Sequence, residues 1–560
     1  MARPRANASP PAPLPPRKGI SDGSLRSLPS RRAERRLRLR RRSRRPRDRP
    51  CRHPAGGAGR RARTAAGHSR GKHLHLSYVD ADSAHKLKTT RLLGDTPPST
   101  DDFTTLGWDT ISAVALTDVN NAIAKYGTSP HAWDGTVRRT KFSPEVALSG
   151  QFEPWTLTTG GTGSKVIMKI PFSAEVVIVD GEDKTDYVVK GGTAGVEVDL
   201  AFDPAQQLRV DTLPDDGKLA LVTDVAFVQP AAGDMPDEDR EWLNKTLKYL
   251  LEQWLNAPAN LGQFQHVFTA VDLNSAEAMG DLAWLVPTHT SYAYINGKNE
   301  DDSYLGVLCM TENRDPGNAP QELAPGAMLG DQQKWSGFTV SKDRFMHKMV
   351  LPGLQHHFPD AKLTVKNGVF TAESEFRMAE IDVDGDSYQP VATLFSVSVD
   401  YDRITTHMQL HIPVNGHIDG YAKIEYAIQP TLGQNSKGQA CVTYRVVQQD
   451  LSQWTTTDGI FGDFELWLGK IADGLGGMLR SVVGDIGLKV LGSILFGGVF
   501  ALMDGLEGMD VEKALDHLPT ADSFAQDATL PIAWTNADVL KPAQVRLHNG
   551  AFQLFGPTFA

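Results

Sequence analysis

Cysteine is scarce in this sequence, with three residues among 560. Cys51 lies in an Arg-rich N-terminal stretch, so only Cys309 and Cys441 remain for the rest of the chain. No CxxC pair and no close group of Cys and His occurs, which argues against a disulfide framework and a zinc finger. The two cysteines fit a reducing compartment, although one disulfide between them stays open.

Long apolar runs are also scarce. The hydrophobic fraction of 40% and the charged fraction of 22% are those of an ordinary globular protein. These proportions exclude collagen-like, wholly disordered and multi-span membrane proteins, and the length allows roughly three domains. The charge-free run at 490–503 has 14 residues, which is shorter than the roughly 20 that a helix needs to cross a bilayer.

Acidic residues are rare at the N-terminus and abundant elsewhere. Residues 1–72, the head, carry 21 Arg and 2 Lys against three acidic residues, a formal charge of +20. Residues 73–560, the body, keep 35 of the 58 basic and 64 of the 67 acidic side chains, a formal charge of −29. A body this acidic repels nucleic acid and anionic lipid at long range, so we expect no nucleic-acid partner for it.

The head is predicted to be disordered, because its Arg- and Pro-rich sequence buries too little apolar surface to offset the entropy of ordering. Its role stays open between an arm for nucleic acid or a membrane surface, a transit peptide, and a translation start assigned too far upstream. It lacks the apolar core of a secretory signal, so we expect cytoplasmic synthesis with no signal peptide, and release by a signal-independent route stays open. Residues 73–102 are interpreted as a linker.

Apolar side chains recur at helical spacing in two shorter segments. The first is 106–127, for which Gly127 is the expected C-cap. The second is 341–358, where Ser341 is the expected N-cap and Pro352 lies in the interior. The sequence predicts an amphipathic helix over each segment.

A longer helix is predicted over 234–258. Asp234 is its expected N-cap, Pro236 lies in the first turn, and the acidic residues that follow suit the positive end of a helix dipole. The helix should end before Pro258. Its apolar side chains form one wide stripe, which predicts a buried face. The stripe comprises Trp242, Leu243, Leu247, Leu250, Leu251, Trp254 and Leu255.

Elsewhere the apolar pattern has period two or forms short runs between Gly, Asp and Pro, which is typical of antiparallel strands. Several strands are predicted within 150–228, with a hairpin turn at 179–183. The remaining predicted strands lie at 284–294, 304–311, 362–379, 391–412, 420–429, 440–449 and 545–556.

The apolar, Gly-rich segment 461–505 also follows a helical stripe. Its glycines weaken a free-standing helix but permit close packing against a sheet or another helix. Three interpretations stay open: a buried or groove-lining core helix, a membrane-interacting segment and a true membrane span. With this segment, the order of amphipathic helix, strands and long helix occurs twice, which divides the body into 103–335 and 336–560.

Catalytic and metal-binding patterns are not recognisable in the sequence. GxSxG and HExxH are absent. GGTGSK at 160–165 lacks the spacing of a phosphate loop and is interpreted as a turn. DVDGDSY at 382–388 has its glycine two positions too early for a calcium loop, so a hairpin turn is favoured. His347, His356 and His357 are interpreted as surface histidines. We therefore expect no enzyme, no metal and no cofactor.

Five segments of the body together resemble the clostridial forty-seven-kilodalton protein family of OrfX-type botulinum neurotoxin clusters. They are residues 107–123 (GWDTISAVALTDVNNAI), 284–296, 304–314, 341–354 and 552–559. That family is similar to the tubular lipid-binding (TULIP) superfamily. The resemblance implies an α+β fold of two tandem units, each a long helix wrapped by a highly curved antiparallel sheet, which together form an elongated rod.

The favoured hypothesis is a non-enzymatic, lipid- or membrane-interacting toxin accessory that holds an apolar ligand at the helix–sheet interface. One alternative is a structural subunit of a toxin or secreted complex with a closed core and a protein partner encoded nearby. Another is a membrane-inserting toxin component that uses 461–505. The candidate lipid contacts are Trp242, Leu247, Leu250, Trp254, Met478, Leu479, Val482, Val483 and Ile486.

Overall fold

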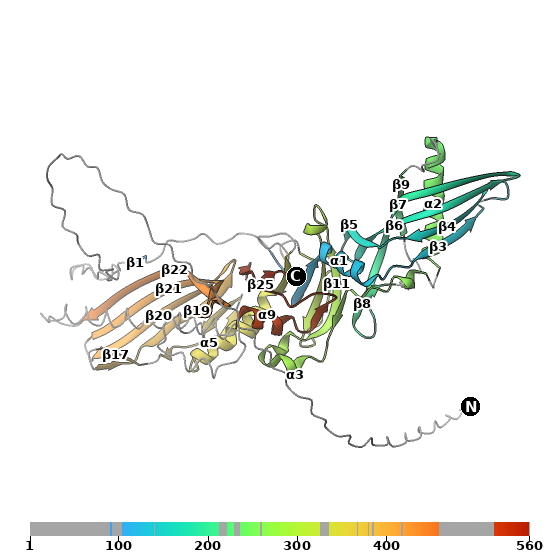
Figure 1. Ribbon diagram of the computed structural model, residues 1–560. Coiled ribbons are helices and arrows are strands. Elements are labelled where there is room, and N and C mark those ends of the chain that lie inside the picture. The colour runs from blue at the N-terminus through green and yellow to red at the C-terminus, as the bar shows by residue number, and fades with distance from the viewer. Residues whose placement is uncertain are drawn as a thin grey trace, which may run out of the picture. The chain divides into compact units, whose positions relative to one another are not determined.

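In the part of the chain that the structure describes, antiparallel β-sheet predominates and helices are few (Figure 1). The computed structural model describes residues 90–91, 103–138, 140–211, 221–228, 236–257, 260–324, 335–366, 368–378, 380–383, 386–415, 418–457 and 520–558. Within these residues the strands form sheets of nine, eight and six strands and one two-stranded ribbon. The α+β class is as predicted, whereas the two tandem tubular units and the rod stay a prediction.

The nine-stranded sheet has the order β23-β10-β8-β7-β6-β4-β3, with β5 paired to β6 and β9 paired to β7. Side chains on β6 alternate between buried and more exposed positions over most of its length, which places one face of the sheet in a core. The strands are β3 (Ala132–Val137), β4 (Glu145–Phe152), β5 (Thr156–Thr162), β6 (Lys165–Asp180), β7 (Asp183–Phe202), β8 (Gln207–Val210), β9 (Leu221–Val228), β10 (Thr269–Val271) and β23 (Ile532–Trp534).

Two turns in this sheet confirm the sequence analysis. Asp180 pairs with Asp183 across the turn predicted at 179–183, and Gly181 has a positive φ of 66°. In the glycine-rich segment 160–165, Gly163 and Ser164 form the turn between β5 and β6, and residues 160–162 belong to β5. Lys165 begins β6 and forms an ion pair with Asp199 at 2.5 Å. The predicted turn is therefore present but shorter than the segment.

Helix α2 (Asp237–Leu255) packs on the nine-stranded sheet, against β3 and β9 (Figure 1). The predicted stripe is its buried face, as expected. The N-cap is Pro236, so the prediction that Asp234 caps the helix was wrong; Asp234 itself lies outside the described residues. Pro236 has extended backbone angles and the acidic first turn follows it directly, which favours the start of the helix at this point.

The six-stranded sheet has the order β11-β12-β2-β13-β25-β24. We call it the central sheet, because it draws strands from both sides of residue 335. Its strands are β2 (Thr110–Ala115), β11 (Pro287–Ile295), β12 (Tyr304–Thr311), β13 (Ser336–Val340), β24 (Gln544–His548) and β25 (Ala551–Gly556). The division of the body at 335/336 stays a prediction, and both predicted units contribute to this sheet.

The helix predicted over 106–127 is half wrong. Residues Thr110–Ala115 form β2, and only Leu116–Tyr126 are helical, as α1. All six residues of β2 are buried, and the strand pairs with β12 on one side and β13 on the other. A short apolar run buried on both faces has no strand period, so its spacing fits a helix equally well. Gly127 is the C-cap in a left-handed conformation, as predicted.

The single strand predicted at 545–556 is a hairpin, β24–β25. Asn549 and Gly550 form its two-residue turn, with φ values of 47° and 82°. An Asn-Gly pair with both residues at positive φ is the turn whose twist matches two antiparallel strands. The sequence carries this signal in full, and the prediction overlooked it.

The eight-stranded sheet has the order β1-β22-β21-β20-β19-β15-β14, with β16 paired to β19. Strands are present over each range predicted between 362 and 449, but 391–412 is a hairpin of two strands and 362–379 holds three short strands. The strands of this sheet are β1 (Thr90–Arg91), β14 (Leu363–Lys366), β15 (Val369–Ala372), β16 (Phe376–Arg377), β19 (Val391–Asp400), β20 (Arg403–Asn415), β21 (Ile418–Gln434) and β22 (Ala440–Thr457). The turn predicted at 382–388 overlaps the two paired strands of the ribbon, β17 (Ile381–Val383) and β18 (Asp386–Tyr388), and residues 384–385 between them lie outside the described residues.

The helix predicted over 341–358 is present in three consecutive pieces. These are α4 (Lys342–Arg344), the π-helical η5 (Phe345–Val350) and α5 (Leu351–His357). The Ser341 hydroxyl accepts a hydrogen bond from the Arg344 N–H, which confirms the predicted cap. Pro352 has no N–H to donate into the preceding turn, and the wider turn of η5 directly before α5 accommodates this loss.

Short helices complete the described fold. They are η1 (Leu261–Gln263), α3 (Ala276–Met279), η2 (Gly280–Leu285), η3 (Glu300–Asp302) and α9 (Ala521–Thr529). The sequence analysis did not predict α9 or β23. The segment 461–505 lies outside the described residues, as do residues 1–72 and most of 73–102. Among the helices that the structure describes, none is both long and apolar enough to cross a membrane.

Candidate functional site

The apolar face of α2 is occupied by side chains of the sheet. Leu247 is 0% and Leu250 3% exposed, and both belong to the core of the nine-stranded sheet. Leu250 lies directly on Gly135 of β3, where an added Cβ would be 3.2 Å from its Cδ2 atom. The Trp254 ring contacts Phe152 of β4 with ring centroids 5.2 Å apart. These neighbours fill the space that a groove along this face would need.

Trp242 lies at the margin of the same core and is half-buried. The structure thus brings Trp242, Leu247, Leu250 and Trp254 to one helix face. The other candidates, Met478, Leu479, Val482, Val483 and Ile486, lie outside the described residues. The assignment of all nine as lipid contacts stays a prediction.

An aromatic cluster lies next to Trp254 in this core. Trp155 meets Phe264 and Phe268 edge-on, with ring centroids 5.8 and 6.1 Å apart. The ring of His266 packs edge-on against Phe268 at 5.1 Å. Burial among these rings lowers the pKa of His266 from 6.5 to about 4, because the charged imidazolium loses its hydration there. At neutral pH His266 is an uncharged core residue, and the sequence analysis did not single it out.

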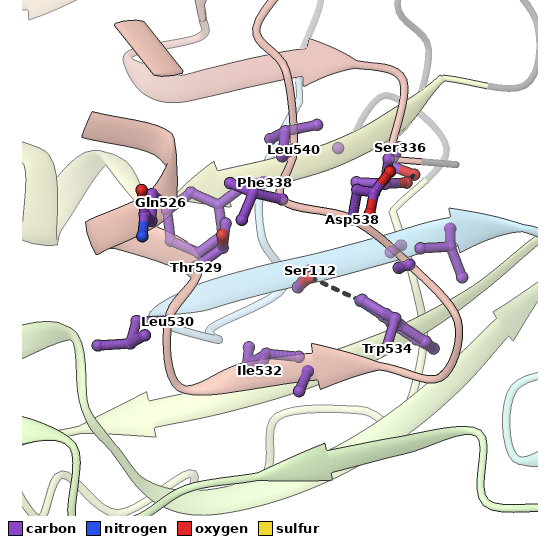
Figure 2. Close-up of a pocket in the computed structure, with 17 residues that line it drawn as sticks. Ser112, Ser336, Phe338, Gln526, Thr529, Leu530, Ile532, Trp534, Asp538 and Leu540 are labelled. Atoms are coloured by element: carbon purple, nitrogen blue, oxygen red, sulfur yellow. Dashed lines mark hydrogen bonds between the residues drawn. The ribbon is translucent and has the colours of Figure 1, made fainter. Parts of the chain in front are cut away.

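A pocket of about 230 Å³ lies where two hydrophobic cores meet (Figure 2). Phe338 and Leu540 belong to the core of the eight-stranded sheet, whereas Val114, Ile532 and Trp534 belong to the core of the nine-stranded sheet. Strands β2 and β13 form one wall, and the segment from Gln526 to Leu540 forms the other. The lining comes from four separate parts of the chain, so no local sequence pattern predicts it.

Polar groups of this pocket are held in place by hydrogen bonds. The Trp534 indole N–H donates to the Ser112 hydroxyl at 3.1 Å (Figure 2). The hydroxyls of Ser336 and Thr558 are hydrogen-bonded to each other. The Asp538 N–H donates to the Thr558 carbonyl at 2.7 Å, which fixes the loop that carries the Asp538 carboxylate.

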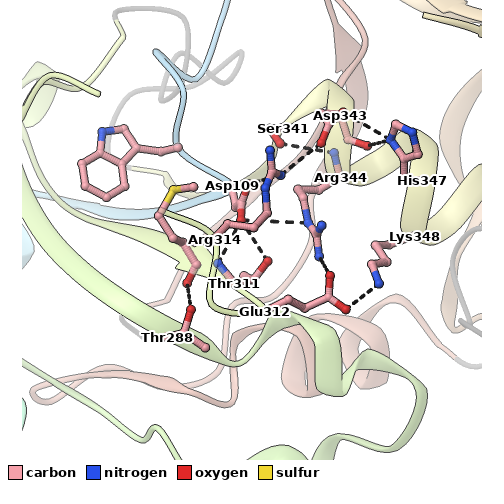
Figure 3. Close-up of polar contacts among 12 residues, drawn as sticks. Asp109, Thr288, Thr311, Glu312, Arg314, Ser341, Asp343, Arg344, His347 and Lys348 are labelled. Carbon is pink, nitrogen blue, oxygen red and sulfur yellow. Dashed lines mark hydrogen bonds and ion pairs between the residues drawn. The ribbon is translucent and has the colours of Figure 1, made fainter. Parts of the chain in front are cut away.

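A second group of polar residues joins the central sheet to the segment α4–α5 (Figure 3). The Asp109 carboxylate is buried and accepts hydrogen bonds from the Thr311 N–H at 2.9 Å, the Thr311 hydroxyl at 3.0 Å and Arg314 at 2.6 Å. These bonds satisfy the acceptor oxygens of the buried carboxylate. Asp109 therefore stabilises the fold at this point and is poorly suited to act as a general base.

Glu312 lies at the edge of this group with a positive φ of 52°. Burial opposes its charge, but hydrogen bonds from Lys348 and Arg344 outweigh burial, so the pKa of Glu312 lies below its usual value. The Arg344 guanidinium also lies 5.4 Å from the Trp284 ring. Positive and negative side chains compensate each other here, which is the pattern of a structural ion-pair network.

The other residues considered for chemistry lie apart from one another. His347 is partly exposed and contacts the Asp343 side chain at 3.2 Å, as expected for a surface histidine. Cys309 and Cys441 are buried and form no disulfide. Burial raises the pKa of the Cys309 thiol to about 12. Among the described residues, no three His, Cys, Asp or Glu side chains are grouped so that they could hold a metal ion.

Known proteins match nearly the whole body. The OrfX-like family, described as Protein OrfX2/OrfX3/P47, matches residues 105–556. Protein OrfX3 of Paraclostridium bifermentans is 26% identical over 507 residues, which cover 81% of this chain and 98% of that protein. Protein OrfX3 of Clostridium botulinum (strain Kyoto / Type A2) is 24% identical over 505 residues and covers the same shares.

Two solved structures share the fold. P47 from Clostridium botulinum A2 superposes with a TM-score of 0.52 at 17% identity, over 81% of this chain and 98% of that one. P47 of Clostridium botulinum E1 gives a TM-score of 0.51 at 16% identity, over 81% and 99% of the two chains. At these identities the likeness concerns the fold alone.

Proposed function

The chain belongs to the OrfX-like family, and from this premise we propose that it is a non-enzymatic accessory protein of a toxin or secreted complex. It acts by contact with another protein, encoded in the same gene neighbourhood. The observation that carries this proposal is the filled interface between α2 and the nine-stranded sheet. Leu247 and Leu250 are almost fully buried by the sheet itself, so this interface resembles a structural core more than a ligand groove.

The charge of the body supports a protein partner. A formal charge of −29 over residues 73–560 favours encounter with a basic surface and slows association with other acidic proteins. The ion-pair network around Asp109 and Arg344 is internally compensated, which supports a structural role for these residues.

Co-expression with each neighbouring gene product tests the proposal. We expect one pairing to purify as a complex of fixed stoichiometry in native mass spectrometry, and to dissociate as the salt concentration rises. The control is the same pairing with an unrelated acidic protein of similar size in place of this chain. If every neighbouring product elutes apart from this chain at low salt, the proposal is wrong.

A second candidate function is contact with lipid or a membrane surface. Phe142 is 84% exposed in the loop between β3 and β4, and the Lys141 ammonium lies 4.8 Å from its ring. Hydrogen bonds between Thr140 and Ser143 hold this loop in shape. An exposed aromatic ring beside a basic side chain suits the interface of a bilayer.

Vesicle co-sedimentation tests this second function. Phe142→Ser should reduce the bound fraction on vesicles of zwitterionic lipid, which the acidic body does not repel. The matched control is Tyr126→Ser, which removes another exposed aromatic ring on α1. Lipid extraction of the purified chain tests the interface at Trp242 and Trp254, where a co-purifying lipid would support an apolar ligand. Equal sedimentation of the wild-type chain and Phe142→Ser argues against the membrane contact.

A further inference from the structure

The pocket between the two cores is small. An apolar cavity of about 150 Å³ holds one benzene molecule, so a pocket of about 230 Å³ has room for roughly nine non-hydrogen atoms. A complete acyl chain of a membrane lipid is larger than that. The pocket is large enough for one amino-acid side chain. It is open to the surface along the wall formed by residues 526–540, where Ala533, Asp538 and Val539 are exposed.

The floor and the rim of the pocket differ in polarity. The floor is apolar and buried, with Phe338 and Leu540 on one side and Val114 and Trp534 on the other. At the rim lies one carboxylate, that of Asp538. Within the described part of the chain, no basic side chain is hydrogen-bonded to or ion-paired with this carboxylate. An occupant that satisfies both parts needs an apolar stem and a cationic end.

We propose that this pocket is the anchor site for a single arginine side chain of a partner protein. The stem of arginine packs on the apolar floor, which includes the Trp534 ring, while its guanidinium meets the Asp538 carboxylate at the rim. Arginine has seven side-chain heavy atoms from Cβ outward, which fits the room for roughly nine. This inference rests on the proposed function and names the chemistry of the partner.

Charge selects arginine over an aromatic anchor of similar size. A phenylalanine ring would fill the floor but would leave Asp538 without a counter-charge at the edge of a closed interface. The acidic body, with a formal charge of −29, draws basic surfaces to it. Buried arginine anchors are also among the side chains that most often dominate the affinity of protein interfaces.

The test uses the full chain and two short peptides, acetyl-Gly-Arg-Gly-amide and its citrulline analogue, which has the same size and no charge. Isothermal titration should give saturable binding of the arginine peptide in the millimolar range. We expect at least threefold weaker binding of the citrulline peptide, and an equal loss for the arginine peptide with Asp538→Asn. Asp522→Asn, at an exposed carboxylate on α9 outside the pocket, is the matched control and should bind as the wild type does.

A variant with a larger side chain in the pocket provides a second, independent test. Ala533 is exposed on β23, so Ala533→Leu narrows the pocket without disturbing a core and should abolish binding of both peptides. Equal affinity for arginine and citrulline, or undiminished binding by folded Asp538→Asn or Ala533→Leu, overturns the arginine anchor. If the arginine peptide fails to bind while a neighbouring gene product still forms a complex, only the anchor is wrong. If no complex forms in any pairing, the proposed function fails as well.

Discussion

At the scale of single residues, the core contains ionisable side chains in two kinds of environment: among aromatic rings, and among hydrogen-bond donors. His266 is kept uncharged by the aromatic rings around it. The buried Asp109 carboxylate accepts three hydrogen bonds. The burial of His266 makes the stability of the fold depend on pH. The hydrogen bonds to Asp109 occupy its carboxylate, so it is poorly suited to act as a general base. Neither environment is visible in the sequence, because both depend on neighbours far away along the chain.

Replacing His266 should change the pH dependence of stability. Its folded pKa of about 4 lies below the unfolded value of 6.5, so the unfolded chain takes up the proton first. The contribution of uncharged His266 to the free energy of unfolding is fully present above pH 6.5. It is lost as the pH falls toward 4, by up to roughly 3 kcal/mol. His266→Phe should therefore flatten the fall of the urea-unfolding midpoint between pH 7 and pH 4.5.

The matched control for this prediction is His131→Phe, which makes the same substitution at an exposed position. A fall of the unfolding midpoint in His266→Phe as steep as that of the wild type would show that other groups cause the pH dependence.

At the scale of elements, alternation and turn residues identified most strands. The pattern succeeded where one face of a strand is buried, as on β6, because burial then alternates along the chain. It failed at β2, which is buried on both faces. The α2 stripe was predicted from spacing alone, whereas the pocket was not, since residues 112–114, 336–338, 526–540 and 558 meet only in the fold.

The β24–β25 turn depends on glycine for two separate reasons. Gly550 has a φ of 82°, and an added Cβ would lie 2.7 Å from the Lys342 side chain and 3.0 Å from the Val399 carbonyl oxygen. Gly550→Ala should lower the free energy of unfolding by about 1–2 kcal/mol through backbone strain, with a further loss from the contact with the Val399 backbone.

Gly438→Ala separates these two causes. Gly438 has a φ of 74° in the β21–β22 turn, and nothing lies within 4 Å of an added Cβ. It should show the backbone strain alone, so its unfolding midpoint in urea should fall less than that of Gly550→Ala. Equal midpoints for the two variants would mean that the contact with Val399 costs nothing measurable.

At the scale of the whole molecule, the central sheet ties the two predicted units together. β13 and β25 from the second half complete the sheet begun by β2, and β23 extends the nine-stranded sheet through β10. The Trp534–Ser112 hydrogen bond adds another link between the two predicted units. Neither predicted unit therefore contains all the strands of the sheets in which it takes part.

The fragment 103–335 should fail to fold alone. Without β13 it exposes the whole edge of β2, and an unpaired buried strand favours aggregation. We expect this fragment to be insoluble or to unfold without a cooperative transition in circular dichroism. The control fragment 73–560 keeps every described strand and should unfold cooperatively. A soluble, cooperative 103–335 would contradict this expectation and support independent units.

Strands that are neighbours in the central sheet are synthesised far apart in time. Ser336 of β13 follows Thr110 of β2 by 226 residues, and Ala551 of β25 follows it by 441 residues. At roughly 5–20 residues per second, β2 leaves the ribosome about 11–45 s before β13 and about 22–88 s before β25. Until β13 emerges, β2 lacks its partner on that edge, and an unpaired buried strand is open to aggregation during synthesis.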